Sequence, residues 1–210
     1  MVFDAALNPY VSRVREHATI ATGLDGFFIP DSSRRSVLDL GCGNGHFLES
    51  LVLKEPQLFA VGIEKRFKRA FKSAEKIQRS QYSPERTKGT RILQMNWIDF
   101  LMFSPTQIWD EIWLQFPDPW PKTRHEKNRL VTALNISLIA KALKPGGVFC
   151  FRSDCLDYFE TLVSLNERHR YFSEALLGRA NDIFRDSPQT LFQKKFLLKG
   201  EPIHSARFKI

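Results

Sequence analysis

Several features are scarce or missing in this sequence of 210 residues. No run approaches the roughly 20 apolar residues that a membrane-spanning helix needs. The first residues have neither the basic stretch nor the apolar core of a signal peptide. Only three cysteines occur, Cys42, Cys150 and Cys155, and neither their number nor their spacing suits a disulfide framework or a zinc site. We therefore expect a cytoplasmic protein with no membrane anchor, structural disulfide or metal ion.

Internal repeats and low-complexity tracts are also absent, and the length is that of one domain. Hydrophobic residues make up 43% and charged residues 26%, which is typical of a folded rather than a disordered chain. The formal net charge is +8. A basic balance favours a polyanionic partner, because neutralising phosphates releases bound counterions. Many basic proteins bind no nucleic acid, so the position of the charges matters more than their sum.

Short apolar strands alternate with helical patterns from residue 36 onward. This alternation predicts an α/β fold, in which a doubly wound, mostly parallel sheet is covered on both faces. The expected parallel strands are 36–40, 58–63, 90–95, 109–116 and 148–153, and the expected helices are 45–54, 66–79 and 129–143. Two more strands, 190–199 and 203–210, are expected to close the sheet as an antiparallel hairpin. The prediction is a seven-stranded sheet in one domain over 36–210, preceded by an N-terminal arm or helix over 1–35.

A glycine-rich loop follows the first expected strand and opens a helix. Its sequence is Asp39-Leu-Gly41-Cys-Gly43-Asn-Gly45, and glycines there let the backbone turn tightly and approach a ligand closely. The dinucleotide-binding fingerprint requires a further glycine three residues after its second, where this chain has His46. That bulky residue argues against a pyrophosphate packed on the helix start.

Carboxylates lie at the ends of the first two strands. Asp39 precedes the glycine loop, and Glu64 lies where doubly wound folds hydrogen-bond a ribose diol. S-adenosylmethionine has a ribose, an adenine, a sulfonium and an ammonium group but no phosphate, so carboxylates suit it. Asn96-Trp97 ends the third strand, where an amide can pair with adenine and an indole can stack on it. Trp97 could equally belong to the core, and a plain strand–turn–helix junction remains the alternative to a cofactor site.

The most unusual stretch follows the fourth strand. It reads Gln115-Phe-Pro-Asp118-Pro-Trp-Pro-Lys122-Thr-Arg-His125-Glu-Lys127-Asn-Arg129. Its three closely spaced prolines impose a stiff, nonregular loop. The loop lies at the carboxyl edge of the predicted sheet, where such folds bind ligands. Asp118 is therefore held rigidly at a predicted site, and the basic residues after it could meet a phosphate backbone.

This stretch resembles the hallmark of the bacterial tRNA (guanine-N7)-methyltransferase family. The agreement also includes Gly62-Ile-Glu64, Leu143-Lys-Pro-Gly-Gly147 and Thr190-Leu-Phe192, and it covers about residues 36–210. The glycine loop and Lys-Pro-Gly-Gly are common among methyltransferases, whereas the proline-rich stretch is specific. The resemblance implies a Rossmann-like methyltransferase fold, S-adenosylmethionine as cofactor, and methyl transfer to N7 of a variable-loop guanine in tRNA.

The resemblance also implies roles for individual residues. Cofactor contacts are implied at Asp39, Glu64, Asn96 and Asp118, of which Asp118 is also the catalytic residue. Gly41, Gly43 and Trp97 complete the predicted cofactor site. Substrate contacts are implied at Lys122, Asp154, Thr190, Leu191, Phe192 and Gln193. Two positions depart from the family, which usually has an acidic residue in place of Asn96 and a glutamate in place of Gln193. An amide at 193 cannot supply the charge of a carboxylate.

The chemistry of guanine N7 fits this set of residues. N7 carries an in-plane lone pair and no proton, so the reaction needs alignment more than a strong base. A fixed carboxylate such as Asp118 would stabilise the positive charge that develops on the purine. Basic residues that could meet RNA phosphates lie beside the proline-rich stretch, at helical spacing over 65–76, and near the C-terminus over 194–209.

Two alternatives remain open at this point, as does the choice between a monomer and a homodimer. Asp-Pro-Trp is similar to the Asp-Pro-Pro-Tyr pattern of enzymes that methylate amino groups, which would make RNA amines or protein side chains the acceptors. A noncatalytic RNA-binding subunit could keep the same fold, although Asp39, Glu64 and Asp118 argue against it.

Overall fold

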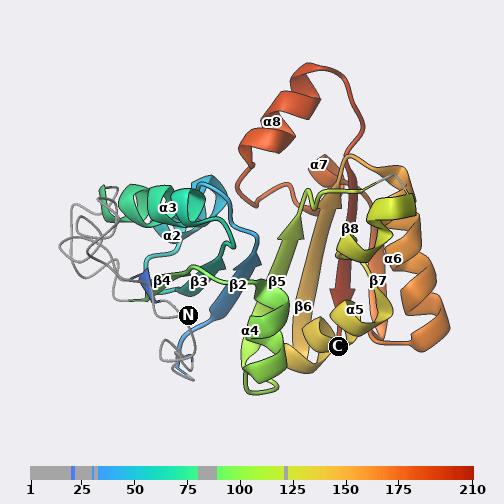
Figure 1. The fold of residues 1–210 in the computed structure, drawn as a ribbon, viewed down its shortest axis with the longest axis horizontal. Helices are drawn as coiled ribbons and strands as arrows, with labels where there is room; N and C mark the ends of the chain where they lie inside the picture. The colour runs from blue at the N-terminus through green and yellow to red at the C-terminus, as the bar shows by residue number, and fades with distance from the viewer. Residues whose placement is uncertain (1–19, 22–29, 31–32, 80–88, 121–122) are drawn as a thin grey trace.

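The computed structural model describes residues 20–21, 30, 33–79, 89–120 and 123–210 (Figure 1). One sheet crosses the molecule in the strand order β1-β4-β3-β2-β5-β6-β8-β7. The strands are β1 (Ile20–Ala21), β2 (Ser36–Leu40), β3 (Phe59–Ile63), β4 (Thr90–Leu93), β5 (Trp109–Gln115), β6 (Leu143–Ser153), β7 (Glu174–Arg179) and β8 (His204–Lys209). The helices are α2 (His46–Lys54), α3 (Phe67–Arg79), α4 (Trp97–Phe103), α5 (Ala133–Ala142), α6 (Leu156–His169), α7 (Ala180–Ile183) and α8 (Leu191–Leu198), with a 3-10 helix, η4, over Thr123–Asn128.

Strands β1 to β6 pair in parallel, and β8 runs antiparallel to both β6 and β7. From the central strand β2 the chain builds outward to β3 and β4, and then returns to place β5 on the other side of β2. The crossovers therefore change direction between β2 and β5. In open α/β sheets the crevice at such a switch point, at the carboxyl ends of the strands, is where ligands bind.

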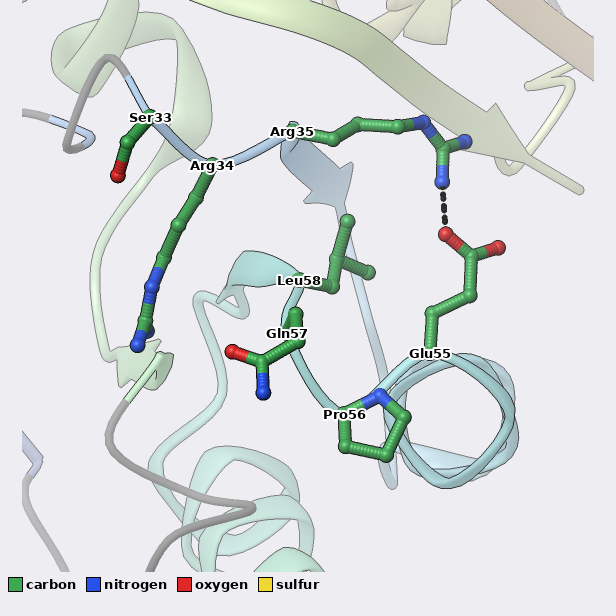
Figure 2. Close-up of a pocket in the computed structure, with 7 residues that line it drawn as sticks. All are labelled: Ser33, Arg34, Arg35, Glu55, Pro56, Gln57 and Leu58. Carbon is green, nitrogen blue, oxygen red and sulfur yellow. Dashed lines mark hydrogen bonds and ion pairs between the residues drawn. The ribbon is translucent and has the colours of Figure 1, made fainter.

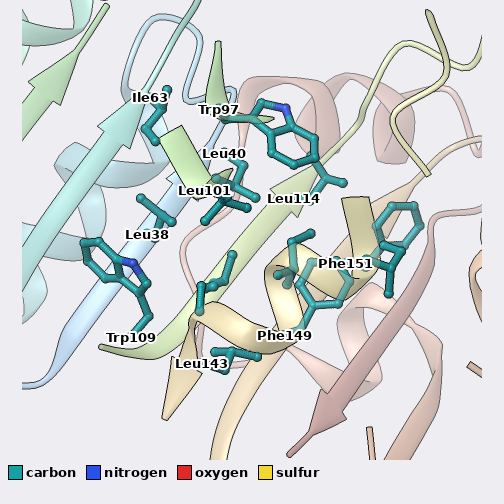
Figure 3. Packing of buried hydrophobic residues seen from close by; sticks show 14 of the residues in the cluster. Leu38, Leu40, Ile63, Trp97, Leu101, Trp109, Leu114, Leu143, Phe149 and Phe151 are labelled. Carbon is teal, nitrogen blue, oxygen red and sulfur yellow. The ribbon is translucent and has the colours of Figure 1, made fainter. Parts of the chain in front are cut away.

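Two hydrophobic clusters cover the two faces of the sheet, because side chains alternate along each strand. Leu38 and Leu40 of β2 pack on one face with Trp97 and Phe100 of α4 and with residues of α5 and α6. Figure 3 shows Trp97, Leu101, Trp109 and Phe149 within this first cluster. Val37 points to the other face, where it packs with side chains of α2 and α3. Asp39 shares that second face with Val37, at the carboxyl end of the strand.

The α/β class, the doubly wound parallel order and the antiparallel closure were predicted correctly. Among the described residues the sheet has eight strands rather than seven, since Ile20–Ala21 adds a short parallel strand beside β4 at the edge. These two residues belong to the predicted arm, most of which lies outside the described residues. No described helix has the length and apolar content needed to cross a membrane.

The predicted C-terminal hairpin is wrong in one of its strands. Residues 190–199 form helix α8, and the antiparallel partners of β8 are β6 and β7. The reason is local, because the Thr190 hydroxyl accepts a hydrogen bond from the Gln193 amide at 3.0 Å and caps the helix. Leucine, glutamine and lysine, which favour helices, fill the turns that follow.

Candidate active site

The predicted site residues come together at the carboxyl ends of β2, β3, β5 and β6. Asp39 lies opposite Gly62 of β3 and Trp113 of β5 in the sheet register, and Glu64 directly follows β3. Two residues after Trp113 on β5, Gln115 lies opposite Arg152 of β6. Helix α8 lies beyond the same end of the sheet (Figure 1). The switch point of the fold therefore collects acidic, amide and guanidinium groups from four strands.

The glycine loop adopts backbone angles that favour glycine at Gly41, Gly43 and Gly45, whose φ values are 76°, 59° and 74°. The amides of Gly41 and Cys42 donate to the Ile63 carbonyl at 2.8 and 2.9 Å, which ties the loop to the end of β3. A Cβ atom at Gly45 would lie 2.2 Å from the Ser73 hydroxyl of α3. Only glycine therefore lets the loop pass this close to α3.

Glu64 holds the glycine loop from the side. Its Oε2 accepts a hydrogen bond from the Gly43 amide at 3.2 Å, and its Oε1 accepts one from the Arg66 amide at 2.7 Å. The residue is buried, with 7% of its surface exposed. Since each oxygen has further lone pairs, this fixed carboxylate can accept additional hydrogen bonds from a ligand's hydroxyl groups.

Asp39 is more deeply buried, and burial is the main reason that its pKa rises to about 7. A hydrogen bond with the Gln115 side chain and the positive charge of Arg152 act in the opposite direction, whereas the Glu64 charge adds to the rise. A ligand cation beside Asp39 would favour its charged form. The site thus provides a carboxylate suited to an ammonium or sulfonium group.

Asn96 and Trp97 are placed by the start of α4. The Asn96 Oδ1 accepts a hydrogen bond from the Ile98 amide at 3.1 Å as the helix N-cap, and the amide nitrogen of the same side chain can donate to a ligand. Trp97 is 6% exposed and lies in the first hydrophobic cluster. Its ring is packed with the core, so the predicted stacking face for adenine is not offered at this position.

The proline-rich loop begins with unusual backbone geometry. Phe116 and Trp120 have φ values of 48° and 44°, which are uncommon for residues other than glycine. The Phe116 amide donates to the Arg152 carbonyl at 2.7 Å, and the Phe116 ring lies 6.0 and 5.6 Å from the rings of Phe192 and Phe196. Between Pro117 and Pro119, Asp118 is exposed. Helix α8 and the loop carrying Asp118 are therefore packed against each other.

The predicted substrate residues occupy two places. Asp154 is exposed directly after β6, and Thr190, Leu191, Phe192 and Gln193 form the start of α8. Of these, Gln193 is 1% exposed, and its Oε1 has no hydrogen-bond partner among the described residues. A buried acceptor without a partner costs free energy, which a ligand N–H group could recover. Lys122 lies outside the described residues.

Comparisons with known proteins identify the family of this chain. Residues 33–206 match the model of a family described as putative methyltransferase. A tRNA (guanine-N(7)-)-methyltransferase from Lactobacillus gasseri is 32% identical over 178 residues, which are 83% of this chain and 80% of that protein. The chain belongs to the tRNA (guanine-N7)-methyltransferase family.

Solved structures share the fold of this family member at low sequence identity. A 16S rRNA (adenine(1408)-N(1))-methyltransferase from Catenulisporales acidiphilia is 16% identical, with a TM-score of 0.57 over 83% of this chain and 87% of that one. A SAM-dependent O-methyltransferase from Thermotoga maritima is also 16% identical, with a TM-score of 0.55 over 84% of this chain and 59% of that one. At this identity the similarity establishes the architecture and nothing more specific.

Three residues near the site of this tRNA (guanine-N7)-methyltransferase family member were not predicted. Gln115 and Arg152 contact each other beside Asp39, and Ser187 hydrogen-bonds Arg152 from the segment before α8. Arg152 could have been noticed in the sequence, since it interrupts an otherwise apolar strand. Nothing in the sequence links it to Ser187, because 35 residues separate the two.

A separate hollow lies at the opposite end of the sheet (Figure 2). It is lined by Ser33, Arg34, Arg35, Glu55, Pro56, Gln57 and Leu58. Arg35 precedes β2 and pairs with Glu55 and with Glu111. None of the predicted site residues lines this hollow, so it is distinct from the candidate active site.

Proposed function

We propose that this protein transfers the methyl group of S-adenosylmethionine to N7 of a guanine in the variable loop of tRNA. The observation that carries the proposal is the packing of the Asp118 loop against α8 at the same sheet edge as the glycine loop, Asp39 and Glu64. Family membership supports the same reaction. The proposal treats 36–210 as one methyltransferase domain with an arm over 1–35, acting in the cytoplasm as a monomer or homodimer.

The pocket residues fit the proposed cofactor. Glu64 is placed to accept hydrogen bonds from the ribose hydroxyls, and Asp39 to face the ammonium group. The Asn96 side-chain nitrogen can donate to an adenine ring nitrogen, and Gly41 and Gly43 leave room for close backbone approach. The glycine loop itself carries no lysine or arginine to neutralise a phosphate, which suits a cofactor without one. When bound, S-adenosylmethionine supplies an electrophilic methyl group on a positively charged sulfur.

Asp118 is the residue proposed to orient guanine. Its position between two prolines restricts the backbone that carries the carboxylate. The carboxylate can accept hydrogen bonds from guanine N1–H and the exocyclic amine, which turns N7 toward the methyl group. It also stabilises the positive charge that develops on the purine. Because N7 carries no proton, Asp118 acts by alignment and charge rather than as a base.

Gln193 has a defined place in this proposal despite its departure from the family pattern. Its buried Oε1 has no partner among the described residues and can accept an N–H hydrogen bond from guanine or from the methionine end of the cofactor. The helix cap at Thr190 fixes the backbone of this turn. A neutral amide gives a weaker hydrogen bond than a carboxylate, so this member is expected to be slower than relatives with glutamate.

Cations on both sides of the candidate active site support tRNA as the substrate. The start of α3 and the turn before it present exposed basic side chains at Lys65, Arg66, Lys68, Arg69 and Lys72. Across the pocket, α8 presents Lys194 and Lys195. Burial lowers the pKa of His46, and the charges of Lys76 and Lys194 lower it further, so cations of α3 and α8 approach the same point at the start of α2. A phosphate backbone could span this opening.

The direct test is transfer of a tritiated methyl group from S-adenosylmethionine to unmodified tRNA, with the product nucleoside identified by mass spectrometry. We expect 7-methylguanosine in the variable loop, and a loss of about 100-fold or more in kcat for Asp118→Asn. Glu167→Gln, which changes an exposed carboxylate near the end of α6, is the matched control and should keep near-full activity. If the product is instead a methylated amino group in RNA or protein, the proposed substrate is wrong. Near-full turnover of Asp118→Asn would refute the role of Asp118.

A further inference from the structure

Arg152 is a fully buried cation for which the proposed reaction has no use. It lies near the carboxyl end of β6 with 0% of its surface exposed. Burial lowers its pKa to about 10, so the guanidinium remains charged at neutral pH. Burying an unpaired charge is costly. The two terminal nitrogens of Arg152 have hydrogen-bond partners, whereas its Nε has none among the described residues. The partners of Arg152 therefore indicate what the residue holds in place.

The guanidinium joins two separate parts of the site. Its Nη1 donates to the Gln115 Oε1 at 3.0 Å and to the Pro188 carbonyl at 3.1 Å. Its Nη2 donates to the Ser187 hydroxyl. The planar guanidinium has several N–H donors and can make such contacts in two directions at once. A lysine ammonium on a flexible side chain does this less well.

Aromatic rings fix the plane of the Arg152 guanidinium. The Arg152 guanidinium carbon lies 4.8 Å from the centre of the Trp113 ring and 4.7 Å from the centre of the Phe184 ring. The two rings are themselves in contact, at 4.7 Å between centres. Cation–π contacts of this kind favour one orientation of the guanidinium. Arg152 is thus a rigid connection rather than a mobile side chain.

One direction leads from Arg152 to the proposed cofactor pocket. Since the Gln115 Oε1 accepts from Arg152, its amide nitrogen is the group that donates to Asp39. Asp39, Gln115 and Arg152 lie on the same face of the sheet, as the alternation along β2, β5 and β6 requires. A cation that binds beside Asp39 is therefore connected to Arg152 through one side chain, that of Gln115.

The other direction leads to the proposed guanine-binding segment. Ser187 and Pro188 precede Thr190, the N-cap of α8, and Gln193 lies in the first turn of that helix. We propose that Arg152 is a positioning residue that ties Asp39 to the segment carrying Thr190 and Gln193, so that cofactor binding and the placement of this segment reinforce each other. This inference rests on the proposed function, since it takes Asp39 as a cofactor ligand and α8 as a guanine ligand.

The inference differs from a purely structural role for Arg152. If Arg152 only filled space between Trp113 and Phe184, its loss would lower stability and loosen 187–193 equally with and without cofactor. If it connects the two parts of the site, cofactor binding will order 187–193 only when the connection is intact. Reciprocity then requires that ordering the segment also tightens cofactor binding.

The test measures amide hydrogen exchange over 185–198 in the full chain, with and without saturating S-adenosylhomocysteine. In the wild type we expect the cofactor product to slow exchange in 187–193 by about tenfold, a typical size for coupling between sites. In Arg152→Met the change should fall below about twofold. In Arg152→Lys, and in Ser187→Ala, which keeps the hydrogen bond from Arg152 to the Pro188 carbonyl, it should lie between these values. Ser137→Ala, which removes a serine hydroxyl on α5, is the matched control and should respond like the wild type.

Each outcome is decisive. A wild-type response in both Ser187→Ala and Arg152→Lys would overturn the connection, and these two variants keep the test valid if Arg152→Met does not fold. Equal loosening of the segment with and without ligand would establish a structural role only. The exchange experiment contains no RNA and is independent of the tRNA methylation assay. If the wild type shows the coupling but methylates no tRNA in that assay, only the proposed function is refuted. Failure of S-adenosylhomocysteine to bind would overturn both.

Discussion

Replacing Asp39 with asparagine should stabilise the protein without ligand while weakening its proposed cofactor binding. Burial raises the pKa of Asp39 from 3.8 to about 7. Between these values the folded protein retains a proton that the unfolded chain has lost, so the free energy of unfolding falls as pH rises through this window. A rise of about 3 pKa units corresponds to about 4 kcal/mol, which is fully lost above pH 7. An asparagine side chain cannot ionise, so the Asp39→Asn variant escapes this loss.

Urea denaturation from pH 5 to pH 8.5 measures the free energy of unfolding of the wild type and of Asp39→Asn as a function of pH. The stability advantage of Asp39→Asn should grow from about 1–2 kcal/mol at pH 5 to about 4 kcal/mol at pH 8. Calorimetry at pH 8 should show the opposite for ligand binding, with S-adenosylmethionine bound at least about tenfold more weakly because a charged hydrogen-bond acceptor is lost. A gain in stability paired with a loss of binding would identify Asp39 as a ligand-binding carboxylate rather than a structural one.

Asp110→Asn provides a control of opposite sign. Although burial acts to raise the pKa of Asp110, hydrogen bonds from Lys144 and Ser36 give a net lowering. Its carboxylate therefore stabilises the fold above its unfolded pKa, and this stability is lost as pH falls through the lower folded pKa. Asp110→Asn should be less stable than the wild type at neutral pH. Parallel pH–stability curves for the wild type and Asp39→Asn would refute the reasoning.

Three further predictions concern the glycine loop, α8 and α3. Gly45→Ala should destabilise the fold in urea by about 1–3 kcal/mol more than Gly43→Ala, since both pay for a left-handed backbone but only Gly45 faces a clash. Gln193→Glu should raise kcat/KM for methyl transfer about fivefold, reflecting about 1 kcal/mol for a charged rather than neutral hydrogen bond; an unchanged rate would remove Gln193 from the site. Arg69→Ala should weaken tRNA binding and lower the slope of log K against log salt by about 1, whereas Arg79→Ala, paired with Glu75, should leave the slope unchanged.

The parts of this protein that could be predicted from sequence depend on local patterns. Parallel strands such as β2 and β3 are buried on both faces and appear as short apolar runs, so their order and ends were clear. The carboxyl ends of parallel strands share one edge, which brought Asp39 and Glu64 together without any knowledge of tertiary contacts. The proline-rich loop could be placed at the same edge for the same reason.

Other features depend on contacts that no local pattern encodes. The apolar residues of 190–199 suit either a strand or a helix, and the Thr190 cap decided for the helix. Trp97 could face a ligand or the core, and the capping of α4 by Asn96 placed it in the core. Helices α4 and α6 and strand β7 were not predicted. The contacts of Arg152 with Ser187 and Pro188 depend on how the chain returns to the sheet after β7.

The strand order divides the active site by the sequence segments that build it. In the proposed reaction the cofactor side comes from the turns after β2, β3 and β4, within 39–66 and at Asn96, whereas the acceptor side comes from the segment carrying Asp118 and from 185–199. These parts meet only at the sheet edge, so evolution can exchange one without rebuilding the other. Grafting the two acceptor segments from a methyltransferase with another nucleobase target is therefore the most economical route to a new specificity. Arg152 stays in β6 in such a graft, so the imported segment must keep acceptors for it at the positions of Ser187 and Pro188.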